Sequence, residues 1–326
     1  MTELRFDGRV AIVTGAGVGL GRSHALLLAS RGARVVVNDI GGSVTGEGSD
    51  RGPAEQVASE IRALGGEAVA DVNSVATPEG GAAIVATAME AFGRVDIVIN
   101  NAGILRDKNF QEMTPDLVEP VLDVHLKGAF NVTRPAFVIM QQQNYGRIVS
   151  TCSASGILGS PAKANYAAAK TGLIGLTRVL AAEGAPHNIK ANALSPIAYT
   201  RMLAHSLEGP EADEQLGPNP EEAKEHLTKM FSETLDPARV SPAVAFLAHE
   251  SCPVSGELYT AGGGQVSRWF IGRTQGYFNR DLTLEDVAAH FDDIRDETGY
   301  VVMNDPAEEV GQVLTAVTGA VTKVKQ

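Results

Sequence analysis

The chain has 326 residues, of which 44% are hydrophobic, and a formal net charge of −12. This length suits one large domain with an extension, or two domains, and the negative charge argues against nucleic acid as a general partner. The two cysteines, Cys152 and Cys252, form neither a disulfide framework nor a zinc-ligand spacing, so no metal site is expected. Because there is no signal-peptide core at the start and no apolar run long enough to span a membrane, we expect a cytoplasmic protein without membrane contact.

Seven short apolar runs predict the strands of an α/β fold, because buried parallel strands appear in a sequence as nearly continuous hydrophobic segments. The predicted strands are residues 9–14, 34–39, 67–71, 94–99, 146–153, 189–196 and 257–261. Helical patterns alternate with them, notably at 54–64, 82–92, 166–183 and 242–249.

A glycine-rich turn follows the first predicted strand. The order of strand, glycine turn and helix offers free backbone N–H groups to a pyrophosphate, and glycine lets the ligand approach closely. The pattern is T-G-x-x-x-G-x-G and not G-x-G-x-x-G, because Leu20 stands at the third glycine position. The alternative is a glycine turn that binds no ligand. The candidate cofactor residues here are Gly15, Val18, Gly19, Leu20 and Gly21.

Polar or small residues also end the next three strands. Asp39 ends the second, where a carboxylate can accept hydrogen bonds from ribose hydroxyls and repel a 2′-phosphate, which favours NAD over NADP. A surface aspartate that opens a turn is the alternative. Residues after the third strand either face the adenine or form a polar turn without a ligand. After the fourth, small residues allow backbone to lie against a flat cofactor, although the asparagines could instead only tie neighbouring strands together. These candidates are Asn73, Ser74, Asn101, Ala102 and Gly103.

Tyr166 and Lys170 lie four residues apart in an alanine-rich segment that predicts the start of a helix. Their side chains therefore leave one face, where a lysine ammonium would lower the pKa of the phenol and suit it to acid–base chemistry near neutral pH. Ser153 ends the preceding strand and could bring a hydroxyl beside the phenol. A helix that carries this pair by chance is the alternative.

The helical region that begins at Thr114-Pro115 should break near Gly128 and kink at Pro135. It contains His125, and a lone histidine on a helix is usually structural. Residues 197–236 are charged and long for a connection, which predicts a substrate lid with a helix at 220–233. Residues 1–267 should thus form the dinucleotide-binding and catalytic domain.

Residues 268–326 are expected to form a C-terminal helical extension packed on the body or on a second subunit. Thr283 to Asp286 resembles a capped helix start. A helical spacing of apolar residues predicts a further helix. These residues are Val310, Val313, Leu314, Val317, Val321 and Val324.

The order and spacing of the glycine turn, of Asn100 to Gly103, and of Ser153, Tyr166 and Lys170 resemble the short-chain dehydrogenase/reductase family over roughly residues 5–265. The resemblance implies a doubly wound (Rossmann) seven-stranded parallel sheet with helices on both faces. It also implies that Tyr166 is the catalytic acid/base, that Lys170 lowers its pKa and holds the nicotinamide ribose, and that Ser153 binds the substrate oxygen. Pro196 would border the cofactor, although proline-isoleucine stands here where proline-glycine is common in the family.

A narrower resemblance joins several segments to the hydroxyacyl-CoA dehydrogenase part of peroxisomal multifunctional enzyme type 2, also called the 17β-hydroxysteroid dehydrogenase type 4 group. The segments include residues 37–42, 102–107 and 249–252. In the wider family an asparagine usually stands where this chain has His125, whereas histidine is usual in this group, and we count His125 among the catalytic candidates.

We therefore expect an NAD-dependent oxidation of a secondary alcohol, and the resemblance implies a 3-hydroxyacyl-CoA as the substrate class. The alternatives are a 17β-hydroxysteroid dehydrogenase, a ketone reductase acting on a free small molecule, or a non-catalytic NAD-binding regulatory protein. A CoA substrate needs nearby cations, and Arg106, Lys108 and Arg201 are the candidates. A homodimer or homotetramer is expected.

Overall fold

The computed structural model describes residues 3–208 and 210–323. These residues form two compact units, of which the first extends to Arg268 and the second begins at Trp269. No helix in the described part of the chain combines the length and the apolar character needed to cross a bilayer.

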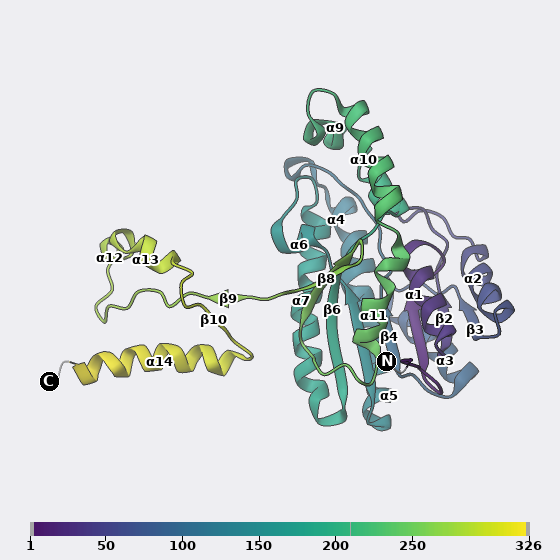
Figure 1. Ribbon diagram of the computed structural model, residues 1–326, viewed down its shortest axis with the longest axis horizontal. Coiled ribbons are helices and arrows are strands. Elements are labelled where there is room, and N and C mark those ends of the chain that lie inside the picture. The colour runs from purple at the N-terminus through teal and green to yellow at the C-terminus, as the bar shows by residue number, and fades with distance from the viewer. Residues whose placement is uncertain (1–2, 209, 324–326) are drawn as a thin grey trace. The chain divides into compact units, whose positions relative to one another are not determined.

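The first unit is built on one sheet with the strand order β3-β2-β1-β4-β5-β6-β7-β8 (Figure 1). Neighbouring strands from β3 to β7 all pair in parallel, as predicted. Their bounds are β1 Val10–Thr14, β2 Arg34–Asn38, β3 Glu67–Asp71, β4 Ile97–Asn100, β5 Gly146–Thr151, β6 Ile189–Ile197 and β7 Leu258–Gly262.

An eighth strand, β8 (Gln265–Trp269), extends the sheet beyond the seven that were predicted. Gly263 and Gly264 alone separate it from β7, with φ of 58° and 92°. Two consecutive residues with positive φ form a tight hairpin turn, so β8 folds back along β7. The glycine pair was the sequence signal for this strand.

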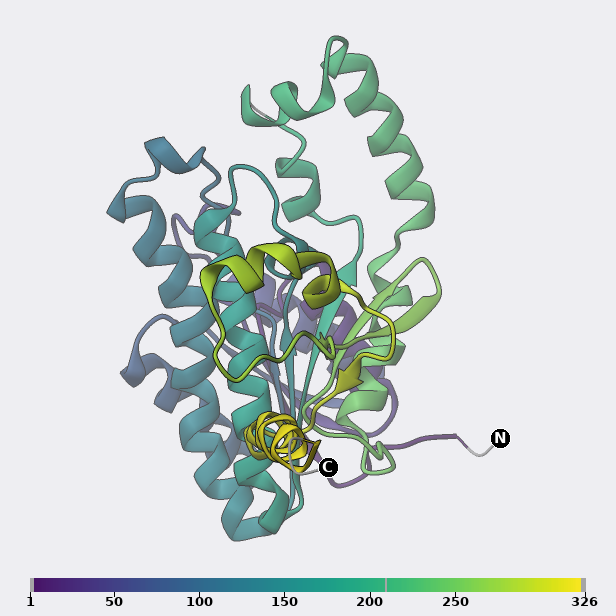
Figure 2. The ribbon, with the colours of Figure 1, turned by 90° about the vertical axis from the view of Figure 1, so that its left-hand side faces the viewer.

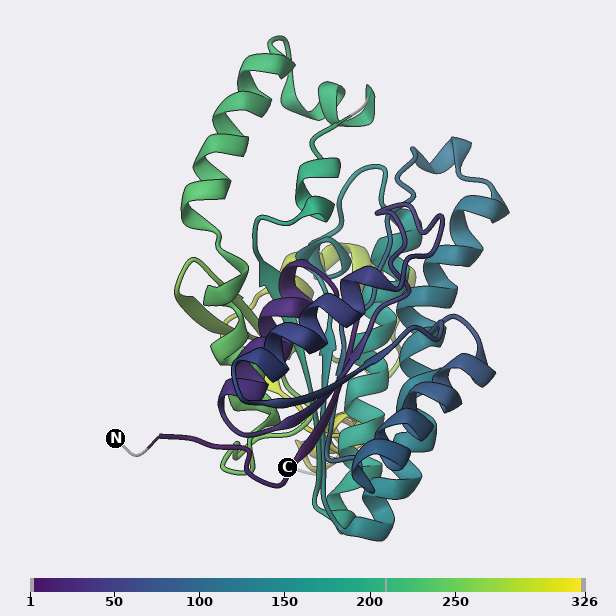
Figure 3. The same ribbon diagram turned by 90° about the vertical axis from the view of Figure 1, so that its right-hand side faces the viewer.

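Helices cover both faces of the sheet. Helices α1, α2 and α11 pack on one face, and α3, α5 and α7 pack on the other (Figures 2 and 3). The bounds are α1 Gly19–Ser30, α2 Gly52–Ala63, α3 Pro78–Phe92, α4 Pro115–Leu122, α5 Gly128–Gln143, α6 Ala154–Leu158, α7 Ala164–Gly184, α8 Arg201–His205, α9 Pro210–Leu216, α10 Pro220–Thr234 and α11 Ser241–Ala248. Short 3₁₀ turns occupy residues 110–112, 185–187 and 237–239.

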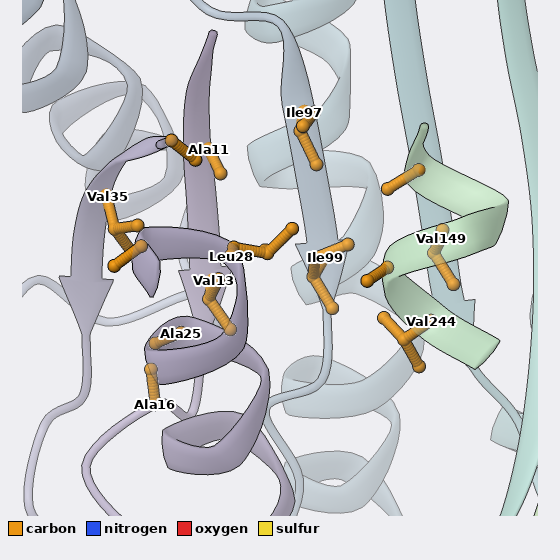
Figure 4. Packing of buried hydrophobic residues seen from close by; sticks show 14 of the residues in the cluster. Ala11, Val13, Ala16, Ala25, Leu28, Val35, Ile97, Ile99, Val149 and Val244 are labelled. Carbon is orange, nitrogen blue, oxygen red and sulfur yellow. The ribbon is translucent and has the colours of Figure 1, made fainter. Parts of the chain in front are cut away.

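Each face of the sheet has its own hydrophobic core. In β1, Ala11 and Val13 face the core shared with α1 and α11, where Leu28 and Val244 pack (Figure 4). The intervening residue, Ile12, belongs to the core on the opposite face. Because side chains alternate along a strand and both faces are buried, the run has no polar position, which explains its continuous apolar sequence.

A one-turn π-helix, Asp123–Lys127, separates α4 from α5. The chain therefore changes its type of helix before Gly128 but stays helical through it, instead of breaking there as expected, and Pro135 lies inside α5. The predicted helix at 220–233 corresponds to α10, in the segment that leaves the C-terminal end of β6.

The second unit contains a two-stranded antiparallel sheet of β9 (Gly272–Arg273) and β10 (Val301–Val302) with helices α12 (Leu284–Ala289), α13 (Phe291–Arg295) and α14 (Pro306–Lys323). Thr283 and Asp286 form a capping box at α12, as predicted. The first four apolar residues of the predicted stripe lie on α14. Val324 and the side chain of Val321 lie outside the described residues.

Candidate active site

The glycine turn joins β1 to α1, and hydrogen bonds to the end of β4 hold it in place. The Asn101 side-chain amide donates to the carbonyls of Thr14 (2.9 Å) and Gly15 (3.0 Å). The Thr14 hydroxyl accepts from the backbone N–H groups of Asn101 and Ala102, at 3.0 and 3.1 Å. A Cβ atom at Gly21 would lie 2.1 Å from the Gly15 carbonyl oxygen, so only glycine fits there. The turn is thus shaped before any ligand binds.

The N-terminus of α1 receives no side-chain cap from the residues that the structure describes. Its first backbone N–H groups have no partners within the helix, and the helix dipole adds partial positive charge there. This end of α1 is therefore suited to a pyrophosphate.

Asp39 is held in place by two backbone donors. Its Oδ2 accepts from Gly17 N at 2.8 Å and its Oδ1 accepts from Gly41 N at 2.7 Å. Each carboxylate oxygen can accept a further hydrogen bond, so the group can still receive ribose hydroxyls. Asn38, the last residue of β2, donates to Asp71 Oδ1 (2.8 Å) and to the Asn73 carbonyl (2.9 Å), which fixes the end of β3 beside the end of β2.

Tyr166 and Lys170 lie in the first turns of α7, and Lys170 is only 3% exposed. The ammonium donates to the Thr151 carbonyl at 2.6 Å and lies 5.5 Å from the centre of the Tyr166 ring. Burial lowers the pKa of Lys170 to about 8. Ser153, at the end of β5, caps α6 by accepting from Ser155 N at 3.2 Å.

Burial raises the pKa of Tyr166 to about 12, and the Ser153 hydroxyl acts in the opposite direction and lowers it. The expectation that Lys170 lowers this pKa below the usual range is therefore wrong for this arrangement. The physical reason is desolvation, which opposes the charged phenolate and outweighs the Ser153 hydroxyl. Tyr166 is consequently a protonated phenol at neutral pH.

His125 lies in the π-helical turn and is 3% exposed. Its Nε2 lies 3.0 Å from Ile104 N and 2.8 Å from Ile104 O, and its ring meets the Tyr166 ring edge-on at 5.1 Å. Burial, followed by the Lys170 charge, lowers the pKa of His125 well below its usual value. A neutral imidazole thus holds the backbone after β4 and packs against the candidate acid/base. Single-turn π-helices occur often at functional sites.

One pocket brings together the predicted cofactor residues from five strand ends. Its lining contains all of Gly15, Val18, Gly19, Leu20, Gly21, Asp39, Asn73, Ser74, Asn101, Ala102, Gly103, Tyr166, Lys170 and Pro196, together with His125.

The structure separates the three candidate substrate cations. Arg106 donates to the carbonyls of Thr45 (3.1 Å) and Asp116 (2.8 Å) and lines a second, adjoining hollow. Lys108 lies 3.6 Å from the Glu112 carboxylate and lines neither the cofactor pocket nor the second hollow. Arg201 lines the cofactor pocket. The three therefore do not form a single phosphate site.

Sequence reasoning missed two contributors to the site. Ile40, Gly42, Ser43, Val44 and Gly46 line the pocket, and their signal was the unusual length of the loop after Asp39. Asn165 is 2% exposed and uses its amide nitrogen to donate to the Arg106 and Leu117 carbonyls, both at 2.8 Å, while its oxygen accepts from Tyr166 N at 2.7 Å. A polar residue directly before the candidate tyrosine was the available signal.

Residues 9–210 match the family model described as short chain dehydrogenase. The chain belongs to the short-chain dehydrogenase family. It is 43% identical to peroxisomal multifunctional enzyme type 2 of Drosophila melanogaster over 96% of this chain and 48% of that protein. Its fold matches the solved full-length structure of that Drosophila enzyme with a TM-score of 0.77 and 36% identity, over 97% of this chain and 50% of the other. The chain thus spans about half the length of this multifunctional relative.

A crystal structure of a short chain dehydrogenase from Mycobacterium avium matches with a TM-score of 0.72 and 34% identity, over 89% of this chain and 95% of that chain. Members of the short-chain dehydrogenase family are oxidoreductases that use nicotinamide cofactors. The pocket fits such a group, because three features lie along one cleft. They are the uncapped N-terminus of α1, the turn in which Gly21 leaves no room for a side chain, and the Asp39 carboxylate.

Proposed function

We propose that this protein is an NAD-dependent dehydrogenase that oxidises the hydroxyl of a 3-hydroxyacyl-CoA to a ketone. The observation that carries the proposal is the single pocket that contains the Asp39 carboxylate after β2 and Tyr166 with Lys170 on α7. The carboxylate supports NAD over NADP, because it would repel a 2′-phosphate. The tyrosine and lysine support proton transfer to and from the oxygen of the substrate.

When bound, the nicotinamide supplies a hydride acceptor for alcohol oxidation. Tyr166 takes the hydroxyl proton in that direction and returns it to the carbonyl oxygen in the other. Ser153 stabilises the substrate oxygen as charge changes on it. Since the Tyr166 pKa is about 12, its phenol form prevails at neutral pH and favours reduction, so the rate of oxidation should rise with pH.

The acyl-CoA part of the proposal is supported by the resemblance to the hydroxyacyl-CoA dehydrogenase part of multifunctional enzyme type 2 and by a second hollow next to the cofactor pocket. Residues 205, 206, 208 and 212 of the expected lid line this hollow, which supports a covering role for 197–236. Its charges are mixed, with Lys163 paired to Asp107. Among the three candidate cations, Arg201 alone makes no ion pair or side-chain hydrogen bond with the described residues, so we propose it as the phosphate partner.

The test compares a 3-hydroxyacyl-CoA with the same hydroxyacyl group on a short thioester that lacks the nucleotide, each with NAD, by absorbance at 340 nm. A kcat/KM that is at least tenfold higher for the CoA thioester is expected. Equal values, or better turnover of a free 17β-hydroxysteroid, would contradict the CoA assignment but not the dehydrogenase assignment. Tyr166→Phe serves as the inactive control in every arm.

A further inference from the structure

The loop after β2, residues 40–50, closes on itself. Asp50 N donates to the Ile40 carbonyl at 2.9 Å, so the two ends of the loop lie together. An inner turn is formed by Ser43 N to Glu47 O at 2.8 Å. Gly41 has a φ of +70°, and a Cβ there would lie 1.9 Å from the Asp50 carbonyl oxygen. Such a compact loop with joined ends is an Ω-loop, a kind of element that is often functional.

One side of this Ω-loop forms a wall of the cofactor pocket. Ile40, Gly42, Ser43, Val44 and Gly46 line it, directly after the Asp39 carboxylate. The facing wall contains residues 101–104, at the end of β4. The two walls approach closely, because the position of a Gly46 Cβ lies 3.0 Å from Ile104 Cδ1. The loop thus extends across the pocket from the candidate ribose partner to the segment after β4.

Two hydrogen bonds connect the Ω-loop to the segment after β4, and a third anchors that segment to α4. Leu105 N donates to the Val44 carbonyl at 2.9 Å. Arg106 donates from Nε to the Thr45 carbonyl at 3.1 Å and from Nη1 to the Asp116 carbonyl at 2.8 Å. One guanidinium therefore links the loop, the segment after β4 and helix α4. Lysine could not do this, because its three donors share one nitrogen whereas arginine donates along a planar fork.

We propose that Arg106 is a positioning residue for the cofactor. Arg106 holds the Ω-loop closed over the pocket, so that the bound dinucleotide dissociates slowly. The proposal rests on the proposed NAD site. It assigns Arg106 a role other than binding a substrate phosphate, because two of its donors are already directed at backbone carbonyls on different elements. The bond to Asp116 anchors Arg106 on α4, so opening the loop requires the hydrogen bond to the Thr45 carbonyl to break. Loss of that bond should raise the dissociation rate more than it changes the association rate.

The test measures NADH dissociation from the full chain by stopped-flow fluorescence, with excess ADP-ribose as the trap. Arg106→Met keeps a long side chain but removes every donor, and it should raise the dissociation rate by about fivefold, as expected for the loss of one hydrogen bond to the loop. The association rate of NADH should stay within about twofold of wild type. Lys108→Met is the matched control, because it removes a neighbouring positive charge but not the contact with the loop.

A dissociation rate for Arg106→Met within twofold of wild type would overturn the proposal. The same would follow if Lys108→Met raised the rate equally, because charge would then explain the effect. Arg106→Gln retains one amide donor and should give a smaller increase, and it replaces the methionine variant if circular dichroism shows that the latter does not fold. If wild type does not bind NADH at all, the proposed function itself fails, which is a different outcome from unchanged dissociation.

Discussion

Replacing Lys170 with methionine should remove a pH dependence of stability that is built into the active site. The folded protein lowers the pKa of this lysine from 10.5 to about 8, because its ammonium is buried. Between these values the unfolded chain binds a proton that the folded chain does not, so the free energy of unfolding rises with pH. The full shift corresponds to about 3 kcal/mol. Below about pH 8 both states are protonated and the folded state bears the whole penalty.

Urea unfolding followed by circular dichroism at pH values from 7.5 to 10.5 would measure this effect as the difference between wild type and Lys170→Met. The variant should be the more stable protein at pH 7.5, by less than the full 3 kcal/mol because the hydrogen bond to Thr151 is lost at a cost of about 1 kcal/mol. Wild type should then gain about 3 kcal/mol relative to the variant as the pH rises to 10.5. Titration of cysteines and tyrosines in the unfolded chain cancels in the difference.

Lys229→Met, on the exposed surface of α10, provides the control and should give a curve parallel to wild type. Parallel curves for wild type and Lys170→Met would refute the reasoning, because they would mean that Lys170 has the same proton affinity in the folded and unfolded chains.

Four further outcomes are expected. Tyr166→Phe should lower kcat by about 10²–10⁴-fold while the NADH dissociation constant stays within a few-fold, and near-normal turnover at neutral pH would exclude it as the acid/base. Ser153→Ala should lower kcat with little change in NADH binding, measured by fluorescence titration, and equal losses in both would point to misfolding. Asp39→Ser should lower the ratio of kcat/KM with NAD to kcat/KM with NADP. A wild-type protein that already prefers NADP would contradict the placement of Asp39 beside the ribose. Truncation after Arg268 should lower the melting temperature or the solubility, and an unchanged, fully active protein would show that the extension is dispensable.

The sequence was informative wherever short-range chemistry determines structure. Continuous apolar runs predicted the seven parallel strands. The glycine turn predicted where polar strand ends gather, because β1 lies between β2 and β4 in the sheet. The Thr283 capping box could be predicted for the same reason, since its two hydrogen bonds span three residues. Such features require no knowledge of distant partners.

Contacts between distant residues were not predictable in this way. Nothing next to Arg106 in the sequence indicates that its guanidinium meets the Thr45 carbonyl, 61 residues earlier. His125 could be named from resemblance, but its contact with the Ile104 backbone depends on the π-helical turn. The direction of the Tyr166 pKa shift was misjudged because burial of the phenol is a property of the assembled fold and not of the spacing to Lys170.

The hydrogen bonds of Asn101 have a consequence for synthesis of the chain on the ribosome. The glycine turn is made early, yet its carbonyl at Gly15 receives the Asn101 amide from 86 residues later. A nascent chain that ends before this residue therefore lacks both the amide that shapes the turn and strand β4, which pairs with β1. The ability to hold a dinucleotide is acquired during translation only after the polypeptide has emerged beyond this asparagine, and the N-terminal segment remains dependent on the chain that follows it until then.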